Sequence, residues 1–127
     1  MATDIMISTE DQPGELARIG EALGEARINI EGVCGIGMEG RGIIHLCVMD
    51  AAPAKAALEA VGLKVEGEAD AILADPVGAV EEPGTMGKIA RRVADAGINV
   101  RVLYTATNNR AVVVTDDNAR AMALMGS

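Results

Sequence analysis

One stretch of this sequence decides its fold. It reads Asp11-Gln-Pro-Gly-Glu-Leu16 and continues through a short amphipathic segment to Ile28-Asn-Ile30. Seventy residues later the chain reads Glu81-Glu-Pro-Gly-Thr-Met86 and continues to Ile98-Asn-Val100. Over 17 aligned positions that begin at the two prolines, 6 residues are identical and most of the others conserve size or charge. Such a repeat predicts two copies of one structural unit, so we expect a tandem duplication.

Composition narrows the class of protein. The chain has 127 residues, a net charge of −8 and a single aromatic residue, Tyr104. The excess of acidic residues argues against binding to nucleic acid or to an anionic membrane. The alternative is that the negative charge only keeps the protein soluble. No apolar run approaches the roughly 18–20 residues that span a bilayer, and the first residues do not resemble a secretory signal. With only two cysteines, these features predict a cytoplasmic protein.

The first copy is expected to alternate strands and helices. Leu16, Ile19, Leu23 and Ala26 fall on one face of a helix, and Gly62 ends a second helix. The expected elements are a strand over 4–9, a helix over 14–26, strands over 28–38 and 43–49, a helix over 54–61 and a strand from 64 onward. Residues 39–42 are expected to form the turn between the second and third strands.

The second copy repeats this order with one departure. We expect a strand over 71–80, a helix whose buried face begins at Met86, strands over 98–107 and 110–115 around a tight turn at 108–109, and a final helix capped by residues 116–118. We expect this copy to lack the last strand, which leaves its first strand as an exposed sheet edge. A second chain covering that edge would make the protein a homodimer; the alternative is a shortened segment.

These orders define the fold class. Both copies are expected to be βαββαβ, ferredoxin-like modules of the α+β class, each with an antiparallel sheet and its helices on one face. We place the modules at residues 1–69 and 70–127 and expect them to pack side by side. A module of about sixty residues buries only roughly 60% of the surface of its unfolded chain, so both modules gain from that packing.

The pattern of a strand, Asp-x-Pro-Gly-x-Leu, an amphipathic helix and Ile-Asn-Ile resembles the ACT domain, a family of small regulatory modules that sense amino acids. The resemblance covers nearly the whole chain, twice. It implies a stand-alone tandem ACT protein with no catalytic domain, in which modules pair and hold an amino acid at the seam between them. The pair could lie within one chain. The resemblance also leaves open a regulatory subunit that docks on an amino-acid biosynthetic enzyme, with ligand binding secondary or lost.

The Pro13-Gly14 turn is the first candidate ligand site. Gly14 has no Cβ, so a ligand can approach the backbone closely, and the first amides of the following helix suit a carboxylate. Asp11 could take the ammonium group of the same ligand. Gly84 and Glu81 occupy the equivalent positions in the second copy. The alternative is that these acidic residues only favour the turn or the helix start.

Two asparagines are the second candidate. Asn29 and Asn99 stand where a strand is expected to begin, although asparagine is unfavourable inside strands. Their amides could contact both ends of an amino acid, or they could cap the preceding turn. Four apolar residues could line a side-chain pocket or belong to the core: Leu16, Ile30, Met86 and Val100. Because the two copies differ at several of these positions, they need not bind the same ligand.

No residue set indicates catalysis or a cofactor. The chain has no G-x-S-x-G, P-loop or G-x-G-x-x-G motif and no zinc-ligand spacing, so we expect neither an enzyme nor a metal protein. His45, the single histidine, is expected to be a packed structural residue because spacing marks no acid–base partner for it. A turn at Gly40-Arg41 would place Cys34 directly opposite Cys47, as two buried thiols or as a strained, reducible disulfide.

Overall fold

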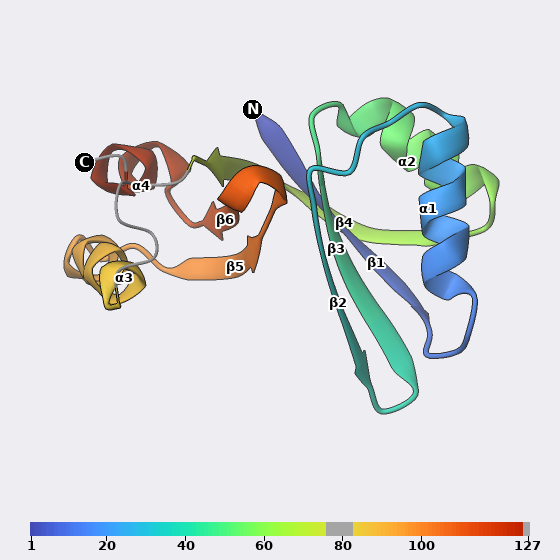
Figure 1. The fold of residues 1–127 in the computed structure, drawn as a ribbon, viewed down its shortest axis with the longest axis horizontal. Helices are drawn as coiled ribbons and strands as arrows, with labels where there is room; N and C mark the ends of the chain where they lie inside the picture. Colours follow the sequence, from blue (N-terminus) through green and yellow to red (C-terminus); the bar gives the residue numbers. More distant parts are fainter. Residues whose placement is uncertain (76–82, 126–127) are drawn as a thin grey trace.

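The structure is a computed structural model that describes residues 1–75 and 83–125. It is of the α+β class, with antiparallel strands and helices on the outer faces (Figure 1). The first strand of the second copy was expected over 71–80, and its part beyond residue 75 lies outside the described residues. Glu81 also lies outside them. The elements are, in order, β1 (Ala2–Glu10), α1 (Glu15–Glu25), β2 (Gly32–Met38), β3 (Arg41–Val48), α2 (Ala51–Ala60), β4 (Lys64–Ala74), α3 (Thr85–Asp95), β5 (Val100–Thr105), η1 (Thr107–Asn109), β6 (Ala111–Thr115) and α4 (Asn118–Met125).

The strands form one sheet in the order β2-β3-β1-β4-β6-β5, and every neighbouring pair is antiparallel. Its first four strands, with α1 and α2, have the βαββαβ order and the strand arrangement expected of a ferredoxin-like unit. The following elements run α3, β5, β6 and α4, which matches the order expected for the second copy as far as its last helix. Among the described residues no helix is long and apolar enough to cross a membrane.

Strand β4 belongs to both halves. Its Ala71 pairs with Ala2 of β1, and the next residue, Ile72, pairs with Val113 of β6. The strand expected from residue 64 and the start of the one expected over 71–80 are therefore one continuous strand, which crosses the predicted module boundary. Of the strand expected over 71–80, only Ala71 has its edge covered by β1, which pairs with β4 no further than this residue.

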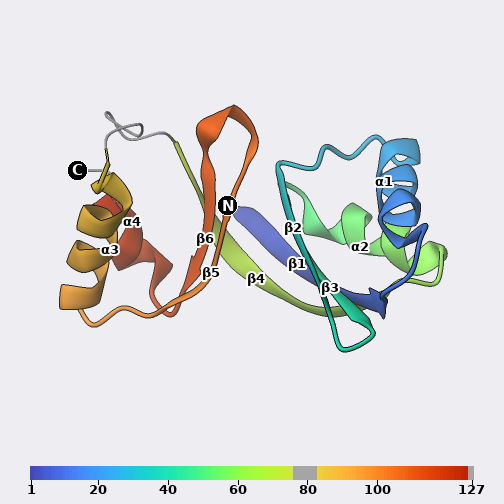
Figure 2. The same cartoon turned by 60° about the horizontal axis from the view of Figure 1, so that its bottom comes forward.

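Three apolar clusters fill the structure. One lies between the first half of the sheet and helices α1 and α2, and another lies beneath α3 and α4. The third joins the halves, because the curl of the sheet turns the helix-free faces of its two halves toward each other, with the helix pairs outside (Figure 2). Its buried members include Cys47 from β3, Tyr104 from β5 and Val112 from β6. The halves, which we expected to pack side by side, thus meet face to face as well as through β4. An isolated bridge also joins Gly32 of β2 to Ala106, which follows β5.

A small cluster of polar side chains lies beside the third apolar cluster, between the two halves. Asp4 of β1 is only 3% exposed. Its Oδ1 accepts a hydrogen bond of 2.6 Å from the Tyr104 hydroxyl, and its Oδ2 lies 2.8 Å from Nδ1 of His45 on β3. His45 is therefore held by a carboxylate, as a packed structural histidine would be. Sequence spacing could not reveal this partner because Asp4 lies 41 residues away, on a neighbouring strand.

The register of the β2–β3 hairpin differs from the expected one by two residues. The turn is formed by Glu39 and Gly40, which both have positive φ angles (51° and 80°), as a two-residue hairpin turn requires. Cys34 therefore lies opposite His45, while Cys47 lies opposite Gly32. The predicted Cys34–Cys47 pair is wrong, and both thiols are free.

Strand starts were also predicted too early. β2 begins at Gly32 and β5 at Val100, so Asn29 and Asn99 lie in the connections that precede the strands. The final helix is capped as expected, since Asp117 Oδ1 accepts a hydrogen bond from the backbone N–H of Arg120 at 3.2 Å.

Candidate ligand-binding site

Each Pro-Gly turn ends in a glycine with an unusual backbone. Gly14 and Gly84 directly precede α1 and α3, and both have a φ angle of 95°. This left-handed conformation favours glycine, which explains why the residue occurs in both copies. A Cβ at either position would have no atom within 4 Å, so the space beside each turn is open. The glycines therefore have a conformational role in addition to the expected role of allowing close approach.

A cleft of ≈ 250 Å³ lies beside the first Pro-Gly turn. It is bounded by the β1–α1 connection, the first turn of α1 and the middle of β2. Its lining residues are Thr9, Glu10, Asp11, Gln12, Glu15, Leu16, Gly35, Ile36, Gly37, Gly42 and Ile44.

Asp11 is held against β2 in this cleft. Its backbone N–H donates to the carbonyl oxygen of Gly40 at 3.0 Å, which ties the β1–α1 connection to the hairpin turn. Its carboxylate lies over Gly37, where an added Cβ would be 2.5 Å from Asp11 Oδ2. Glycine at position 37 is thus required for this placement. Within residues 1–75 and 83–125, the Asp11 carboxylate forms no hydrogen bond or ion pair.

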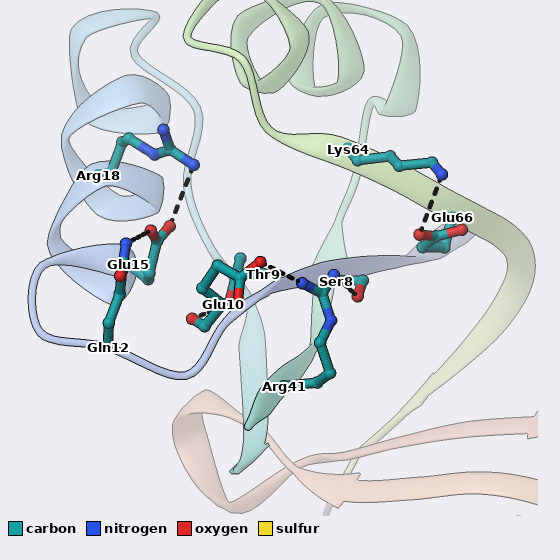
Figure 3. A network of polar contacts seen from close by, with 9 residues as sticks. All are labelled: Ser8, Thr9, Glu10, Gln12, Glu15, Arg18, Arg41, Lys64 and Glu66. Atoms are coloured by element: carbon teal, nitrogen blue, oxygen red, sulfur yellow. Dashed lines mark hydrogen bonds and ion pairs between the residues drawn. The ribbon is translucent and has the colours of Figure 1, made fainter. Parts of the chain in front are cut away.

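The neighbouring carboxylates have partners (Figure 3). Glu15 accepts hydrogen bonds from Gln12 at 2.9 Å and from Arg18 at 3.0 Å. Glu10 accepts one from Arg41 at 2.9 Å, and Arg41 also donates to the Ser8 hydroxyl at 2.7 Å. The charge that the described residues leave uncompensated in the cleft is therefore that of Asp11.

The start of α1 supplies the complementary groups. The first backbone bond of the helix runs from the N–H of Arg18 to the carbonyl oxygen of Gly14 at 2.9 Å. The N–H groups of residues 15–17 consequently have no intrahelical acceptor, and the helix dipole adds positive potential there. A free carboxylate beside unbonded amides is an arrangement that can hold the ammonium and the carboxylate of an α-amino acid.

Of the other ligand-binding residues predicted in the first copy, some lie at this cleft and some do not. Pro13 and Gly14 form the turn that leads into it. Leu16 lines it and is 65% exposed, so it is not a core residue. Asn29 and Ile30 do not line it, because they follow the far end of α1 (Figure 1).

The predicted residues of the second copy lie on the other half of the molecule. Gly84 and Met86 begin α3, and Met86 is 72% exposed. Asn99 exchanges two hydrogen bonds with Asp116, through its N–H at 3.1 Å and its carbonyl oxygen at 3.2 Å, and Val100 begins β5. Helices α1 and α3 lie at opposite ends of the molecule (Figures 1 and 2), so one chain does not bring the two Pro-Gly turns together.

Sequence reasoning missed the contribution of β2. Gly35 and Gly37 were not predicted to belong to a site, yet they lie within the strand and line the cleft. Because glycine weakens strand interiors, the three glycines of β2 could have indicated a close approach of another segment. In the described part of the chain, no group of three or more His, Cys, Asp or Glu side chains could hold a metal ion.

The fold defines a small ferredoxin-like module, and the cleft beside its first Pro-Gly turn is its candidate site. A family model agrees with this description: residues 3–62 match the ACT domain. Among curated proteins, no sequence matches the chain.

Solved structures extend the likeness to nearly the full length. The chain is 25% identical to the regulatory subunit of aspartate kinase from Thermus thermophilus in its ligand-free form, with a TM-score of 0.73 over 98% of this chain and 87% of that one. It is 23% identical to the regulatory subunit of aspartate kinase from Thermus flavus, with a TM-score of 0.72 over 98% and 88%. A protein from Bacteroides thetaiotaomicron shares the fold at 23% identity, with a TM-score of 0.77 over 97% and 85%.

Proposed function

We propose that this protein is a non-catalytic regulator that binds a free amino acid in the Asp11 cleft. Two things support a regulatory, ligand-binding role: the ACT domain and the similarity to regulatory subunits of aspartate kinase. The observation that carries the proposal is the Asp11 carboxylate, which lacks a partner among the described residues and lies beside the open start of α1. Asp11 would bind the ammonium group and the helix start would bind the carboxylate. The two free cysteines suit the cytoplasm, where we place the protein.

The cleft is open on the side of β2. This strand pairs with β3 along one edge, and within the described residues its other edge makes only the bridge from Gly32 to Ala106. Val33 of this strand and Leu16 of α1, which lines the cleft, are 47% and 65% exposed. We propose that a second copy of the chain covers them, so that the seam between modules forms in a homodimer and closes the cleft. In this arrangement Asn29 or Asn99 of one copy would reach the ligand from across the seam.

The test is a thermal-shift screen with the twenty amino acids. A ligand at a hundred times its dissociation constant adds about 2.7 kcal/mol of apparent stability, which is readily measured. We expect at least one amino acid to raise the melting temperature of the wild-type protein.

Matched glycine variants make the screen specific for the cleft. Gly37→Ala should abolish the shift, because its Cβ would displace the Asp11 carboxylate. Gly35→Ala should retain it, since a Cβ there would meet only Ile44 at an ordinary 3.6 Å. Asn29→Ala and Asn99→Ala report separately on the seam. If no amino acid shifts the wild-type protein, or if Gly37→Ala responds as well as Gly35→Ala, the proposed site is wrong.

A second candidate function is that of a subunit that docks on an amino-acid biosynthetic enzyme. The similarity to structures of aspartate kinase regulatory subunits favours it. A stoichiometric complex with a purified aspartate kinase catalytic chain, detected by size-exclusion chromatography with light scattering, would support this function. Elution of the two proteins as separate peaks at micromolar concentration would count against that partner.

A further inference from the structure

A buried carboxylate organises the polar side chains between the two halves. Asp4 accepts hydrogen bonds through both of its oxygens, from the Tyr104 hydroxyl at 2.6 Å and from His45 Nδ1 at 2.8 Å. Because a charge is costly to bury, a carboxylate that is only 3% exposed and bonded to two titratable side chains marks a candidate functional site. None of these three residues lines the Asp11 cleft, so the cluster has no part in the proposed amino-acid site.

The bond to Asp4 determines which nitrogen of His45 can accept a proton. Because a carboxylate only accepts hydrogen bonds, Nδ1 of the neutral ring carries the proton and Nε2 keeps its lone pair. Among the described residues Nε2 has no hydrogen-bond partner, and the His45 side chain is 21% exposed. Nε2 is therefore free to act as a base, and the Asp4 carboxylate would stabilise the imidazolium that results.

A thiol lies directly across the sheet from this histidine. Cys34 of β2 pairs with His45 of β3, and side chains that pair in this way have Cβ atoms about 4.5–5.5 Å apart. Cys34 is half-buried and packs against the third apolar cluster, so it lies on the same helix-free face as Tyr104. Rotation about the Cα–Cβ bond of Cys34 can therefore bring its sulfur to the imidazole. Cys34, His45 and Asp4 thus have the order of a nucleophile, a base and a residue that positions the base.

The second thiol does not share these surroundings. Cys47 is fully buried, and its burial, with the nearby Asp4 charge, raises the pKa of its thiol to about 11. It lies opposite Gly32, which makes it a diagonal neighbour of Cys34. Diagonal neighbours are about 7–8 Å apart, whereas the Cα atoms of a disulfide are rarely more than about 6.8 Å apart. Cys34 is therefore placed to react with a molecule from solution and not with Cys47.

We propose that Cys34 is a modification site that exchanges with low-molecular-weight disulfides, with His45 as its base and Asp4 as the residue that positions His45. His45 Nε2 takes the thiol proton while the Cys34 sulfur attacks one sulfur of the reagent, whose S–S bond breaks. The products are a mixed disulfide on Cys34 and a small thiolate, which takes up the proton from His45. Cys34 is oxidised and the departing half of the reagent is reduced, so the step needs no other oxidant. The attached group lies between the halves, and a reducing thiol removes it.

The experiment measures the rate of exchange with dithiodipyridine, an uncharged disulfide that releases a coloured thiopyridone. All variants carry Cys47→Ala, which leaves Cys34 as the single thiol. Each rate is measured in the native protein and in the same protein unfolded in urea, at the same neutral pH. Burial alone would make the native rate the slower one. We expect the native rate to be about tenfold faster, which is less than general bases commonly contribute in enzymes because no pocket holds this reagent.

Substitutions of the base and its neighbours assign the effect. His45→Gln should remove the excess of the native rate over the unfolded rate, and Asp4→Asn should reduce it. The matched control is Met6→Leu, since Met6 lies opposite His45 on the other neighbouring strand and this change conserves volume; it should leave the excess unchanged. The pH profile of the native rate should also contain an inflection, from protonation of His45, that His45→Gln removes. The other charged groups near the thiols, Glu31 and Arg110, are retained in every variant.

Three results would overturn the proposal. The first is a native rate no faster than the unfolded rate, the second is an unchanged rate in His45→Gln, and the third is an equal loss in Met6→Leu, which would assign the effect to packing. Circular dichroism verifies folding. If His45→Gln does not fold, the pH profile of the protein that retains His45 decides, and a profile with a single inflection, that of the thiol, overturns the proposal. The test involves no amino acid, so its outcome is independent of the proposed function.

Discussion

Replacing Tyr104 by phenylalanine tests how the two halves are held together. The change removes only the hydroxyl, which donates a 2.6 Å hydrogen bond to the buried Asp4 carboxylate. The ring keeps its place in the apolar cluster between the halves. Burial, together with the hydrogen bond to Asp4, raises the pKa of the Tyr104 phenol well above its ordinary value, so it is a proton donor at neutral pH.

The magnitude follows from burial. A hydrogen bond to a charged group contributes about 1.5–3 kcal/mol, and a buried carboxylate that loses a donor bears the full cost of its lost solvation. We therefore expect Tyr104→Phe to lower the free energy of unfolding by about 2 kcal/mol. In urea the midpoint should fall by about 1 M while the m-value stays unchanged, because the surface exposed on unfolding is the same.

A double-mutant cycle with Asp4→Asn assigns the loss to this bond. If the bond is responsible, the double variant should cost less than the sum of the single variants. The account is refuted if Tyr104→Phe changes the free energy of unfolding by less than about 0.5 kcal/mol, the range of surface substitutions. The account is also refuted if the changes in the free energy of unfolding caused by the two substitutions are additive.

Three further predictions address the backbone and the thiols. Gly14→Ala should lower the free energy of unfolding by about 1–2 kcal/mol, because φ at this position is 95°, and equilibrium denaturation measures it; a neutral effect would contradict the required left-handed backbone. Burial, with the nearby Asp4 charge, raises the pKa of the Cys47 thiol from 9.0 to about 11. In the native protein Cys34 should therefore be alkylated much faster than Cys47, as peptide mapping would show; equal rates would contradict the burial of Cys47. As the pH rises, the Cys47 thiol ionises first in the unfolded protein, so its effect on the free energy of unfolding is absent below about pH 9 and destabilising between about pH 9 and pH 11. In urea titrations Cys47→Ala should therefore lessen the fall in stability over this pH range. An unchanged fall would assign it to other groups.

The sequence predicted the fold well where the signal is local. The apolar spacing of α1, the Pro-Gly turn before it and the aspartate cap of α4 depend on neighbours a few residues away. The register of the β2–β3 hairpin was missed because Glu39, not Arg41, takes the other position of positive φ beside Gly40. One misplaced turn residue moved Cys34 from its predicted partner, Cys47, to His45.

Contacts across the molecule could not be predicted. The partnership of Asp4 with Tyr104 spans 100 residues and depends on the curl of the sheet, which no local pattern encodes. The sharing of β4 between the halves was likewise missed, since a continuous strand and two short ones have the same alternation. At the site, Asp11 and Gly14 were identified from the helix start, while the part played by Gly37 required the structure.

The central claim is that the Asp11 cleft binds a free amino acid. Isothermal titration calorimetry with each of the twenty amino acids, on wild type and on Asp11→Asn, tests it most directly. The account predicts saturable binding of at least one amino acid to wild type and loss of that binding in Asp11→Asn, which removes the charge while keeping the shape. Absence of binding by all twenty, or equal binding by both proteins, would contradict it.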